Sequence, residues 1–343
     1  MFLVKGKKAI KRNYQIIDTI SADLSYQLTN IQQNASKQIL KCIKNNQSVI
    51  VNAVCGSGKT ELVYETIEYF LNNNKIIAFA IPRKDVVNEI YHRLIKDYPT
   101  VDISMVCGGN TNKLEGQIVV LTTHQLFRYE DYFDLLILDE ADAFPYYENE
   151  LLNVFLKKSC KGLVIYLSAT MKSQYLNECE EVVYVNRRFH NKDLPVPKIV
   201  KYNKANSITI LNKTIESLRG KPILIFVPTI DCGKKLEKKL NCPFVYSSYK
   251  YKEKYINEFK ENKINILITT SILERGMTFF DVQVIVYDAQ HDLFDESSLI
   301  QISGRVGRKL KAPTGNVYFL ATKITSSMRK CIKTIKIKNR TIV

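Results

Sequence analysis

The stretch Ala53-Val54-Cys55-Gly56-Ser57-Gly58-Lys59-Thr60 decides the fold of the first half of the chain. It overlaps the end of an apolar run at 48–54 and precedes an amphipathic segment at 61–72, so it connects a strand to a helix. Gly56 and Gly58 let the backbone turn so that several N–H groups face one anion. Lys59 can reach the β and γ phosphates of a nucleotide, and Thr60 can offer its hydroxyl to Mg²⁺. The stretch therefore predicts a phosphate-binding loop for ATP and Mg²⁺.

A nucleotide site also needs carboxylates for the metal and for the attacking water. Eighty residues after the loop, Leu135-Leu136-Ile137-Leu138 forms an apolar strand that ends in Asp139 and Glu140. We expect Asp139 to hold Mg²⁺, directly or through water, and Glu140 to orient and deprotonate the water. An acidic pair alone is common, but its place at the carboxyl end of a buried strand makes it specific.

Short apolar runs alternate with longer amphipathic segments along the chain. Strands are expected at 48–54, 75–81, 117–122, 135–139 and 162–167, with helices at 61–72 and 84–96. After the prolines at 195 and 197 the alternation restarts, with strands expected at 222–227, 243–246, 264–269, 282–287 and 316–320. This pattern predicts an α/β protein with two tandem doubly wound parallel-sheet domains. The expected organisation is a basic extension at 1–27, a first domain at 28–190, a linker at 191–205, and a second domain with a basic tail at 206–343.

The remaining motifs of the first half resemble those of superfamily 2 helicases, in the same order. Alanine in place of the first loop glycine is frequent in that superfamily. The resemblance implies RecA-like domains with the ATP site in the cleft between them. It also implies roles by position. Either Gln32 or Gln33 would contact the adenine edge, and the loop residues at the nucleotide would be Ala53, Gly56, Ser57, Gly58, Lys59, Thr60 and Glu61. Nucleic acid would be contacted by Pro82, Arg83, Thr122, Thr123 and His124, while Ser168, Ala169 and Thr170 would link hydrolysis to domain movement.

The second half carries the matching motifs. Thr269 and Thr270 would contact nucleic acid and Gly276 the nucleotide, as the resemblance implies. The stretch Gln301-Ile302-Ser303-Gly304-Arg305-Val306-Gly307-Arg308 places two arginines three residues apart, on one face if the segment is helical. An arginine supplied across a cleft can stabilise the charge that spreads over a γ-phosphoryl group. We expect Arg305 and Arg308 to form such a pair, with Arg308 favoured, and Gln301 to take part in coupling.

A narrower resemblance is to ComFA, the competence ATPase family of Gram-positive bacteria. Residues 139–142 also spell the DEAD motif of RNA helicases, but the last motif begins with Gln301 instead of His-Arg. The residues similar to ComFA lie at 56–61, 83–87, 139–145, 188–190, 194–197 and 272–276. The family implies single-stranded DNA as the track, a membrane DNA-uptake channel nearby and cytoplasmic competence proteins as partners. The family's four-cysteine zinc module would precede the motor, and because no cysteine precedes Cys42, we expect no such module in this sequence.

Charge is distributed unevenly over the 343 residues, whose net charge is +16. Residues 1–195 have a net charge of +1, whereas residues 196–343 contain 27 basic and 12 acidic residues, a net of +15. This asymmetry suggests a polyanionic partner, because each neutralised phosphate releases a counterion. The eight cysteines form no Cys-x-x-Cys pair, which fits a reducing compartment better than a zinc site. With no apolar run of about eighteen residues and no signal peptide, a cytoplasmic protein is expected, with peripheral association at the inner face of the membrane left open.

Three functions remain open from the sequence. The first is an ATP-driven translocase on single-stranded DNA, as the ComFA resemblance implies. The second is a DNA or RNA helicase that separates duplexes, which the lack of an evident wedge or hairpin insertion disfavours. The third is a nucleic-acid-binding scaffold with a degenerate motor. The presence of Lys59, Asp139, Glu140, Arg305 and Arg308 argues against the third.

Overall fold

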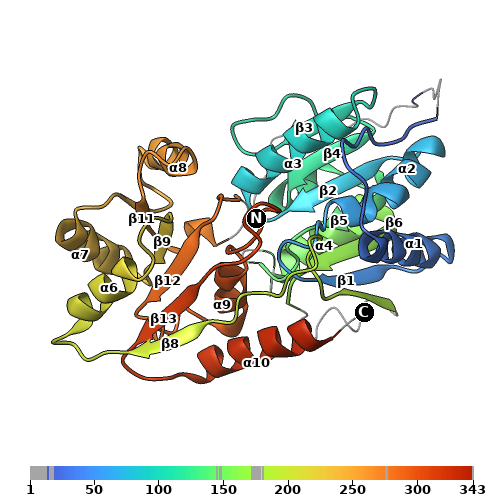
Figure 1. Cartoon of the computed structure of the whole chain (residues 1–343). Helices are drawn as coiled ribbons and strands as arrows, with labels where there is room; N and C mark the ends of the chain where they lie inside the picture. Colours follow the sequence, from blue (N-terminus) through green and yellow to red (C-terminus); the bar gives the residue numbers. More distant parts are fainter. Residues whose placement is uncertain are drawn as a thin grey trace. The chain divides into compact units, whose positions relative to one another are not determined.

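The structure is a computed structural model that describes residues 14, 19–143, 146, 149–170, 179, 181–274 and 277–341. The chain divides into two compact units, with the boundary between Val185 and Asn186. In Figure 1 the first unit is coloured from blue to green and the second from yellow to red. Each unit is a parallel β-sheet with helices, as the alternation of the sequence predicts.

The first unit contains a seven-stranded sheet in the order β3-β4-β2-β5-β6-β1-β7, with all pairs parallel. Its strands are β1 (Val49–Ala53), β2 (Ile77–Ile81), β3 (Ile103–Val106), β4 (Ile118–Thr122), β5 (Phe133–Leu138), β6 (Cys160–Ser168) and β7 (Glu181–Val185). Its helices are α1 (Asn30–Lys44), η1 (Glu61–Val63), α2 (Tyr64–Asn72), α3 (Lys84–Asp97), η2 (Thr123–Arg128) and α4 (Glu150–Ser159). Strands β3 and β7 were not predicted from the sequence. They occupy the two edges of the sheet, where four or five residues give little hydrophobic signal.

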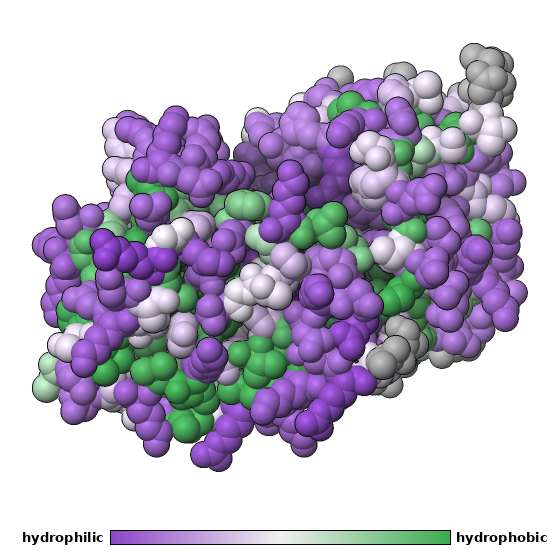
Figure 2. All heavy atoms as spheres, in the orientation of Figure 1, coloured by the Kyte–Doolittle hydropathy of each residue, from purple (hydrophilic) through white to green (hydrophobic). Residues whose placement is uncertain are grey.

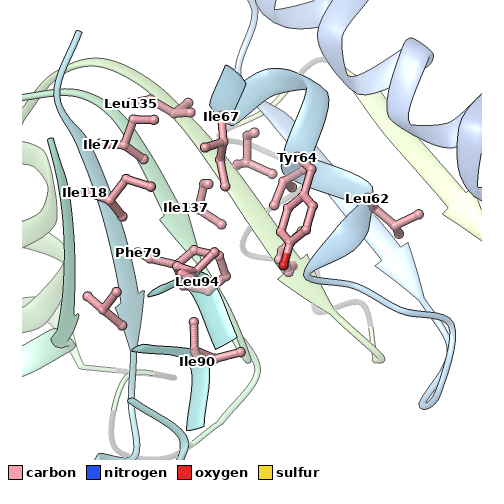
Figure 3. Close-up of a cluster of buried hydrophobic side chains, with 14 of the residues drawn as sticks. Leu62, Tyr64, Ile67, Ile77, Phe79, Ile90, Leu94, Ile118, Leu135 and Ile137 are labelled. Carbon is pink, nitrogen blue, oxygen red and sulfur yellow. The ribbon is translucent and has the colours of Figure 1, made fainter. Parts of the chain in front are cut away.

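Both faces of this sheet are buried. Along β2, Ile77 and Phe79 pack in one hydrophobic cluster, whereas Ala78 and Ala80 pack in another on the opposite face. Figure 3 shows the first cluster, where Ile67 lies with strand residues of the sheet. A continuous apolar run is therefore the expected pattern for these strands.

The segment just before α1 packs on the first unit. Ile20, Ala22 and Leu24 are partly buried against its core. The backbone N–H of Ile20 donates to the Asn72 side chain at 2.8 Å, and that of Asp23 donates to the carbonyl of Asp97 at 2.7 Å. The prediction of an extension over the whole of 1–27 therefore needs correction, because its last residues belong to the first unit. Residues 1–13 and 15–18 lie outside the described residues.

The second unit contains a six-stranded parallel sheet in the order β10-β11-β9-β12-β13-β8. Its strands are β8 (Lys198–Lys201), β9 (Ile223–Phe226), β10 (Phe244–Val245), β11 (Ile266–Thr269), β12 (Gln283–Tyr287) and β13 (Val317–Ala321). Its helices are α6 (Ser207–Glu216), α7 (Ile230–Leu240), α8 (Lys252–Lys260), η3 (Ser271–Leu273), α9 (Glu296–Ser303) and α10 (Ser326–Arg340).

The predicted linker at 191–205 also differs from the structure. It contains β8, which pairs with β13 through four residues and forms an edge of the second sheet. The two prolines directly precede β8, and parallel pairing with β13 incorporates Lys198–Lys201 into the sheet. The second unit accordingly begins at Asn186, before the predicted linker.

Candidate ATP and nucleic-acid site

Five of the predicted motifs lie along one edge of the first sheet. The consecutive strands β4, β2, β5, β6 and β1 are parallel, so their carboxyl ends meet at the same edge. In that order the edge presents Thr122, Pro82, Asp139, Ser168 and Ala53. In open α/β sheets ligands bind outside the carboxyl ends of the strands. Motifs that are as much as 115 residues apart in the chain are thereby brought to one place.

The loop after β1 has the conformation that a phosphate-binding loop requires. Gly56 and Gly58 have φ angles of 83° and 80°, in the left-handed region that glycine adopts without strain. The N–H of Ser57 donates to the carbonyl of Val54 at 3.1 Å, which closes the turn. The Ser57 hydroxyl is buried and has no hydrogen-bond partner among the described residues. A buried polar group of this kind in a glycine-rich loop fits a nucleotide phosphate.

Of the two neighbouring glutamines, Gln32 is the one that contacts the loop. Its Nε2 donates to the carbonyl of Ser57 at 2.9 Å, and its Oε1 accepts from the N–H of Thr29 at 3.0 Å in a capping box at the start of α1. A Cβ on Gly58 would lie 2.4 Å from Gln32 Nε2, so a side chain there would displace the Gln32 amide, and the positive φ of Gly58 itself favours glycine. Gln33 instead donates to the carbonyl of Leu28 at 2.9 Å. Contact between Gln32 and adenine stays a prediction.

Arg93 in α3 is a loop contact that the sequence did not reveal. Its Nη1 donates to Thr60 Oγ1 at 3.3 Å and lies 3.7 Å from Glu61 Oε1. The Tyr26 hydroxyl donates to the same carboxylate oxygen at 2.9 Å. These groups hold the end of the loop, including the hydroxyl predicted to bind Mg²⁺. A lone arginine inside an amphipathic helix carries no motif, so only the fold could show this contact.

The acidic pair follows β5 as predicted, with two distinct environments. Asp139 is buried, and burial raises its pKa to about 6; the neighbouring Glu140 acts in the same direction, whereas Lys59 opposes it. Glu140 has a left-handed backbone, with φ of 54°, and its N–H donates to Asp139 Oδ1 at 2.8 Å. Backbone strain at a non-glycine residue is frequent at functional sites.

The residues present fit a magnesium nucleotide. No group of three or more histidine, cysteine, aspartate or glutamate side chains that could hold a metal is found in the described part of the chain. Mg²⁺ instead needs only one or two carboxylates when substrate phosphates and water complete its shell. Asp139 and the Thr60 hydroxyl would be its protein ligands, and the Lys59 ammonium would face the same phosphates.

Asp142 connects the acidic motif to the predicted coupling motif. The Thr170 hydroxyl donates to Asp142 Oδ2. Ser168 Oγ donates to the carbonyl of Thr170 at 2.6 Å and accepts from its N–H at 3.1 Å. The sequence suggested roles for 139, 140 and 168–170 but none for Asp142, because the contact spans 28 residues. Phe144 and Pro145 of the same motif lie outside the described residues.

The predicted nucleic-acid contacts of the first unit lie together but differ in exposure. Ile81 and Thr122 are paired in register on β2 and β4, so Pro82 and Thr123 follow adjacent strand ends. Pro82, Thr122 and Thr123 are buried, whereas Arg83 is half-buried and His124 is exposed. Arg83 and His124 therefore have the accessible side chains of this group. Contact of the five residues with nucleic acid stays a prediction.

The corresponding motif of the second unit follows β11. Thr269 is buried and its hydroxyl donates to the carbonyl of Thr270 at 3.0 Å, whereas Thr270 itself is half-buried. Gln301 is buried in α9. Gly276, predicted to contact the nucleotide, lies outside the described residues.

The two predicted arginines have different surroundings. Helix α9 ends at Ser303, so Arg305 and Arg308 lie in the turn after it, and the expectation of one helix face was wrong. Arg305 is 1% exposed, and its guanidinium donates to the carbonyls of Glu274, at 2.9 Å, and of Met277. Arg308 is half-buried and donates from Nε to the carbonyl of Gly304 at 2.7 Å. Arg308 is thus the more accessible guanidinium of the two.

Arg188 and His190 fix this arginine-containing turn. Arg188 is buried, and its Nη1 donates to the carbonyls of Val306 and Gly307, each at 2.7 Å. His190 Nε2 lies 2.8 Å from the same Gly307 carbonyl, while its Nδ1 accepts from the N–H of Lys192 at 3.1 Å. Gly307 has a φ of 71°, and a Cβ there would lie 2.5 Å from the carbonyl oxygen of Pro313. The sequence similarity to ComFA at 188–190 gives no indication that Arg188 and His190 contact the Val306-Gly307 turn.

Comparison with known proteins agrees with this arrangement. Residues 25–173 match the family described as type III restriction enzyme, res subunit, and residues 206–309 match the helicase conserved C-terminal domain. A competence protein ComFA of Streptococcus pneumoniae is 36% identical over 92% of this chain and 78% of its own length. The chain belongs to the ComFA family. The ComFA protein of Bacillus subtilis is 35% identical over 91% of this chain and 72% of its own length.

The fold is shared with solved helicase structures. Dbp5 of S. cerevisiae, bound to RNA and ADP BeF3, has a TM-score of 0.71 and 17% sequence identity, covering 92% of this chain and 89% of its own. The two units are therefore tandem RecA-like domains, and this ComFA-family chain is of the superfamily 2 helicase type. Within the described residues, no helix has the length and apolarity to span a membrane.

Proposed function

We propose that this chain hydrolyses ATP to move along single-stranded DNA, as a motor for the uptake of transforming DNA. The observation that carries the proposal is the ordered edge of the first sheet, where the phosphate-binding loop, the acidic pair, the Ser168–Thr170 motif and the nucleic-acid motifs follow consecutive strands. Membership of the ComFA family, whose named relatives are competence proteins, supports a role in the uptake of DNA.

In the proposed hydrolysis, the loop backbone and Lys59 would bind the phosphates, and Asp139 with Thr60 would hold Mg²⁺, which supplies charge neutralisation when bound. Glu140 orients a water molecule and accepts its proton. Arg93 keeps Thr60 in place through its 3.3 Å hydrogen bond. Asp142 follows the acidic pair in the chain and accepts a hydrogen bond from the Thr170 hydroxyl. Through this hydrogen bond, a movement of the acidic pair on hydrolysis would shift the Ser168–Thr170 motif.

The second unit would supply the guanidinium that stabilises the transferred phosphoryl group. We assign this role to Arg308, because Arg305 is buried and bonded to backbone carbonyls. An arginine in such a position accelerates nucleotide hydrolysis by about 10³-fold or more. Repeated binding and hydrolysis would then drive domain movement, and thereby movement along the strand.

Two observations favour single-stranded DNA as the track. The second half of the chain is positively charged and can bind phosphates, and the relatives are named as competence proteins. Residues 196–343 have a net charge of +15. A motor that slides must bind the backbone without reading bases. We further propose peripheral association with a membrane DNA-uptake channel and cytoplasmic competence proteins, as the family name of the relatives suggests.

The test is steady-state ATP hydrolysis without polymer, with single-stranded DNA, with duplex DNA and with single-stranded RNA. Each polymer is tested at low and moderate salt, because phosphate contacts weaken steeply as salt rises. Stimulation by single-stranded DNA above the other polymers is the expected result. Preferential stimulation by RNA would replace the proposal with an RNA helicase, and no hydrolysis under any condition would replace it with a nucleic-acid-binding scaffold.

A further inference from the structure

A ten-residue segment of the second unit, from the end of β10 to the middle of α8, contains four tyrosines and three lysines. The segment Tyr246–Tyr255 has the sequence YSSYKYKEKY, and none of its residues belongs to the motifs discussed above. The tyrosine ladder is defined here as Tyr246, Tyr249, Tyr251 and Tyr255. Aromatic rings interleaved with cations are the surface chemistry that proteins use for single-stranded nucleic acid.

The rings of the ladder form a continuous series that starts in the core. Phe244 of β10 is buried against Gly233, and its ring centroid lies 5.2 Å from that of Tyr246. Tyr246 and Tyr249 are 5.5 Å apart, and Tyr249 stacks on Tyr255 at 6.2 Å with an interplanar angle of 19°. Tyr249 also meets the edge of Tyr251 at 6.1 Å. The inner end of the series is therefore anchored, which limits the conformational freedom lost when a ligand binds the outer end.

The outer end of the ladder is exposed and positively charged. Tyr251 is 53% exposed, and Lys250 Nζ lies 5.5 Å from the centroid of its ring. Lys254 Nζ lies 6.0 Å from the ring of Tyr255 and 3.9 Å from Glu258. Within the segment the single acidic residue is Glu253, so three lysines outweigh it. Figure 2 shows hydrophilic side chains over the exposed face of α8.

The ladder begins next to a predicted nucleic-acid motif. Strand β10 pairs with β11, where Val245 is in register with Thr269. The N–H of Thr270 donates to the carbonyl of Val245 at 3.4 Å. Tyr246 thus follows directly after a residue bonded to the Thr269-Thr270 motif. A strand whose phosphates contact that motif would have its bases within reach of the neighbouring rings.

We propose that the tyrosine ladder is a base-stacking surface for single-stranded DNA, with Tyr251 as its outermost ring. The inference rests on the proposed function, and it adds contact with base faces to a motor otherwise expected to bind only the backbone. Stacking is tolerant of sequence because every base has a π face. Tyr246 is partly buried against the core that contains Phe244, and it anchors the ladder. A purely structural role does not account for Tyr251, which is exposed and has Lys250 Nζ near its ring.

The absence of tryptophan from the chain permits a direct spectroscopic test. Tyr251→Trp would introduce a single tryptophan whose fluorescence reports stacking. Tyr69→Trp is the matched control, since Tyr69 is 38% exposed in the first unit and has Lys44 Nζ 5.1 Å from its ring centroid. Both proteins are titrated with oligo-dT and with an abasic strand of equal length. We expect oligo-dT to quench only Tyr251→Trp, and the abasic strand to quench neither.

Binding affinities complete the test. Tyr251→Ala is expected to weaken oligo-dT binding about tenfold, a typical loss for one stacked base, and to leave abasic-strand binding unchanged. Tyr251→Phe, which keeps the ring, should bind oligo-dT like the wild type, and thermal melting checks that each variant is folded. Equal binding of oligo-dT by wild type and Tyr251→Ala would overturn the stacking surface while leaving the proposed track intact. Failure of the wild type to bind any single strand would overturn both.

Discussion

The carboxyl ends of the two parallel sheets present different chemistry. In the first unit this edge gathers a lysine, a hydroxyl and an acidic pair of which Asp139 is buried. The corresponding edge of the second unit presents threonines after β11 and the tyrosine ladder after β10. Net charge differs in the same sense, at +1 for residues 1–195 and +15 for 196–343. One fold used twice thus presents an acidic pair beside a glycine-rich loop in one unit, and hydroxyls, cations and aromatic rings in the other.

Arginine substitutions test the contribution assigned to the second unit and have the largest expected effect. Arg308→Ala should lower kcat for ATP hydrolysis by about 10³-fold with little change in melting temperature, because its guanidinium is assigned to the phosphoryl group. Arg305→Ala should instead lower the melting temperature, since the buried Glu274 and the half-buried Met277 would each lose the donor to their carbonyl. If Arg308→Ala kept wild-type kcat, the assignment of the two arginines would be wrong.

Glu140→Gln tests the contribution of the first unit. The amide cannot accept the proton from water, so turnover should fall by at least about 10²-fold while ATP still binds. Lys59→Ala is the comparison, because it removes a phosphate contact and should also weaken ATP binding. Fluorescent-nucleotide titration and steady-state hydrolysis distinguish the two. Normal hydrolysis by Glu140→Gln would refute the assignment of the base.

Thr170→Val tests whether the chemistry of the first unit is coupled to movement. The substitution removes the hydroxyl that donates to Asp142, a hydrogen bond to a charged group. We expect DNA movement per ATP hydrolysed to fall about tenfold, with smaller change in hydrolysis itself. Thr170→Ser keeps the hydroxyl and serves as the control. An unchanged ratio of movement to hydrolysis in Thr170→Val would show that this contact does not couple them.

The smallest expected effect is a pH dependence of the stability of the second unit, which we attribute to His190. Burial lowers its pKa and the nearby Arg188 acts in the same direction, although the hydrogen bond to Gly307 opposes this. A histidine with a lowered pKa in the folded state binds protons more readily when unfolded. The free energy of unfolding should therefore decline as the pH falls from about 6.5 toward the folded-state pKa. It should stay unchanged above about pH 6.5.

Melting temperatures between about pH 5 and 8 would detect this decline, and His190→Gln should flatten it. The exposed His92→Gln in α3 is the matched control. A wild-type profile identical in slope to that of His190→Gln would contradict the lowered pKa of His190.

Local motifs predicted the nucleotide loop, the acidic pair and the alternation of strands and helices, because each depends on residues close together in the chain. The sequence could not predict β7 or β8, since an edge strand gains its stability from a partner far along the chain. Likewise, Arg93 bonds to Thr60 across 33 residues, and Arg188 to Gly307 across 119. Contacts that span such separations carry no periodic pattern.

Burial also separated residues that the motifs treated as equivalent. Thr123 and His124 are adjacent in one motif, yet the first is fully buried and the second exposed. Arg305 and Arg308 belong to one motif, yet α9 ends before both and Arg308 is the more accessible of the two. The sequence of a motif predicts the kind of site. The position at which a helix or strand ends determines which side chains of the motif are accessible to a ligand.

Movement along the strand is tested most directly by ATP-driven displacement of streptavidin from biotinylated single-stranded DNA, with the biotin at either end. We expect displacement from one end by the wild type, none by Glu140→Gln, and a reduced rate for Tyr251→Ala. Strong DNA-stimulated hydrolysis without displacement from either end would contradict movement along the strand.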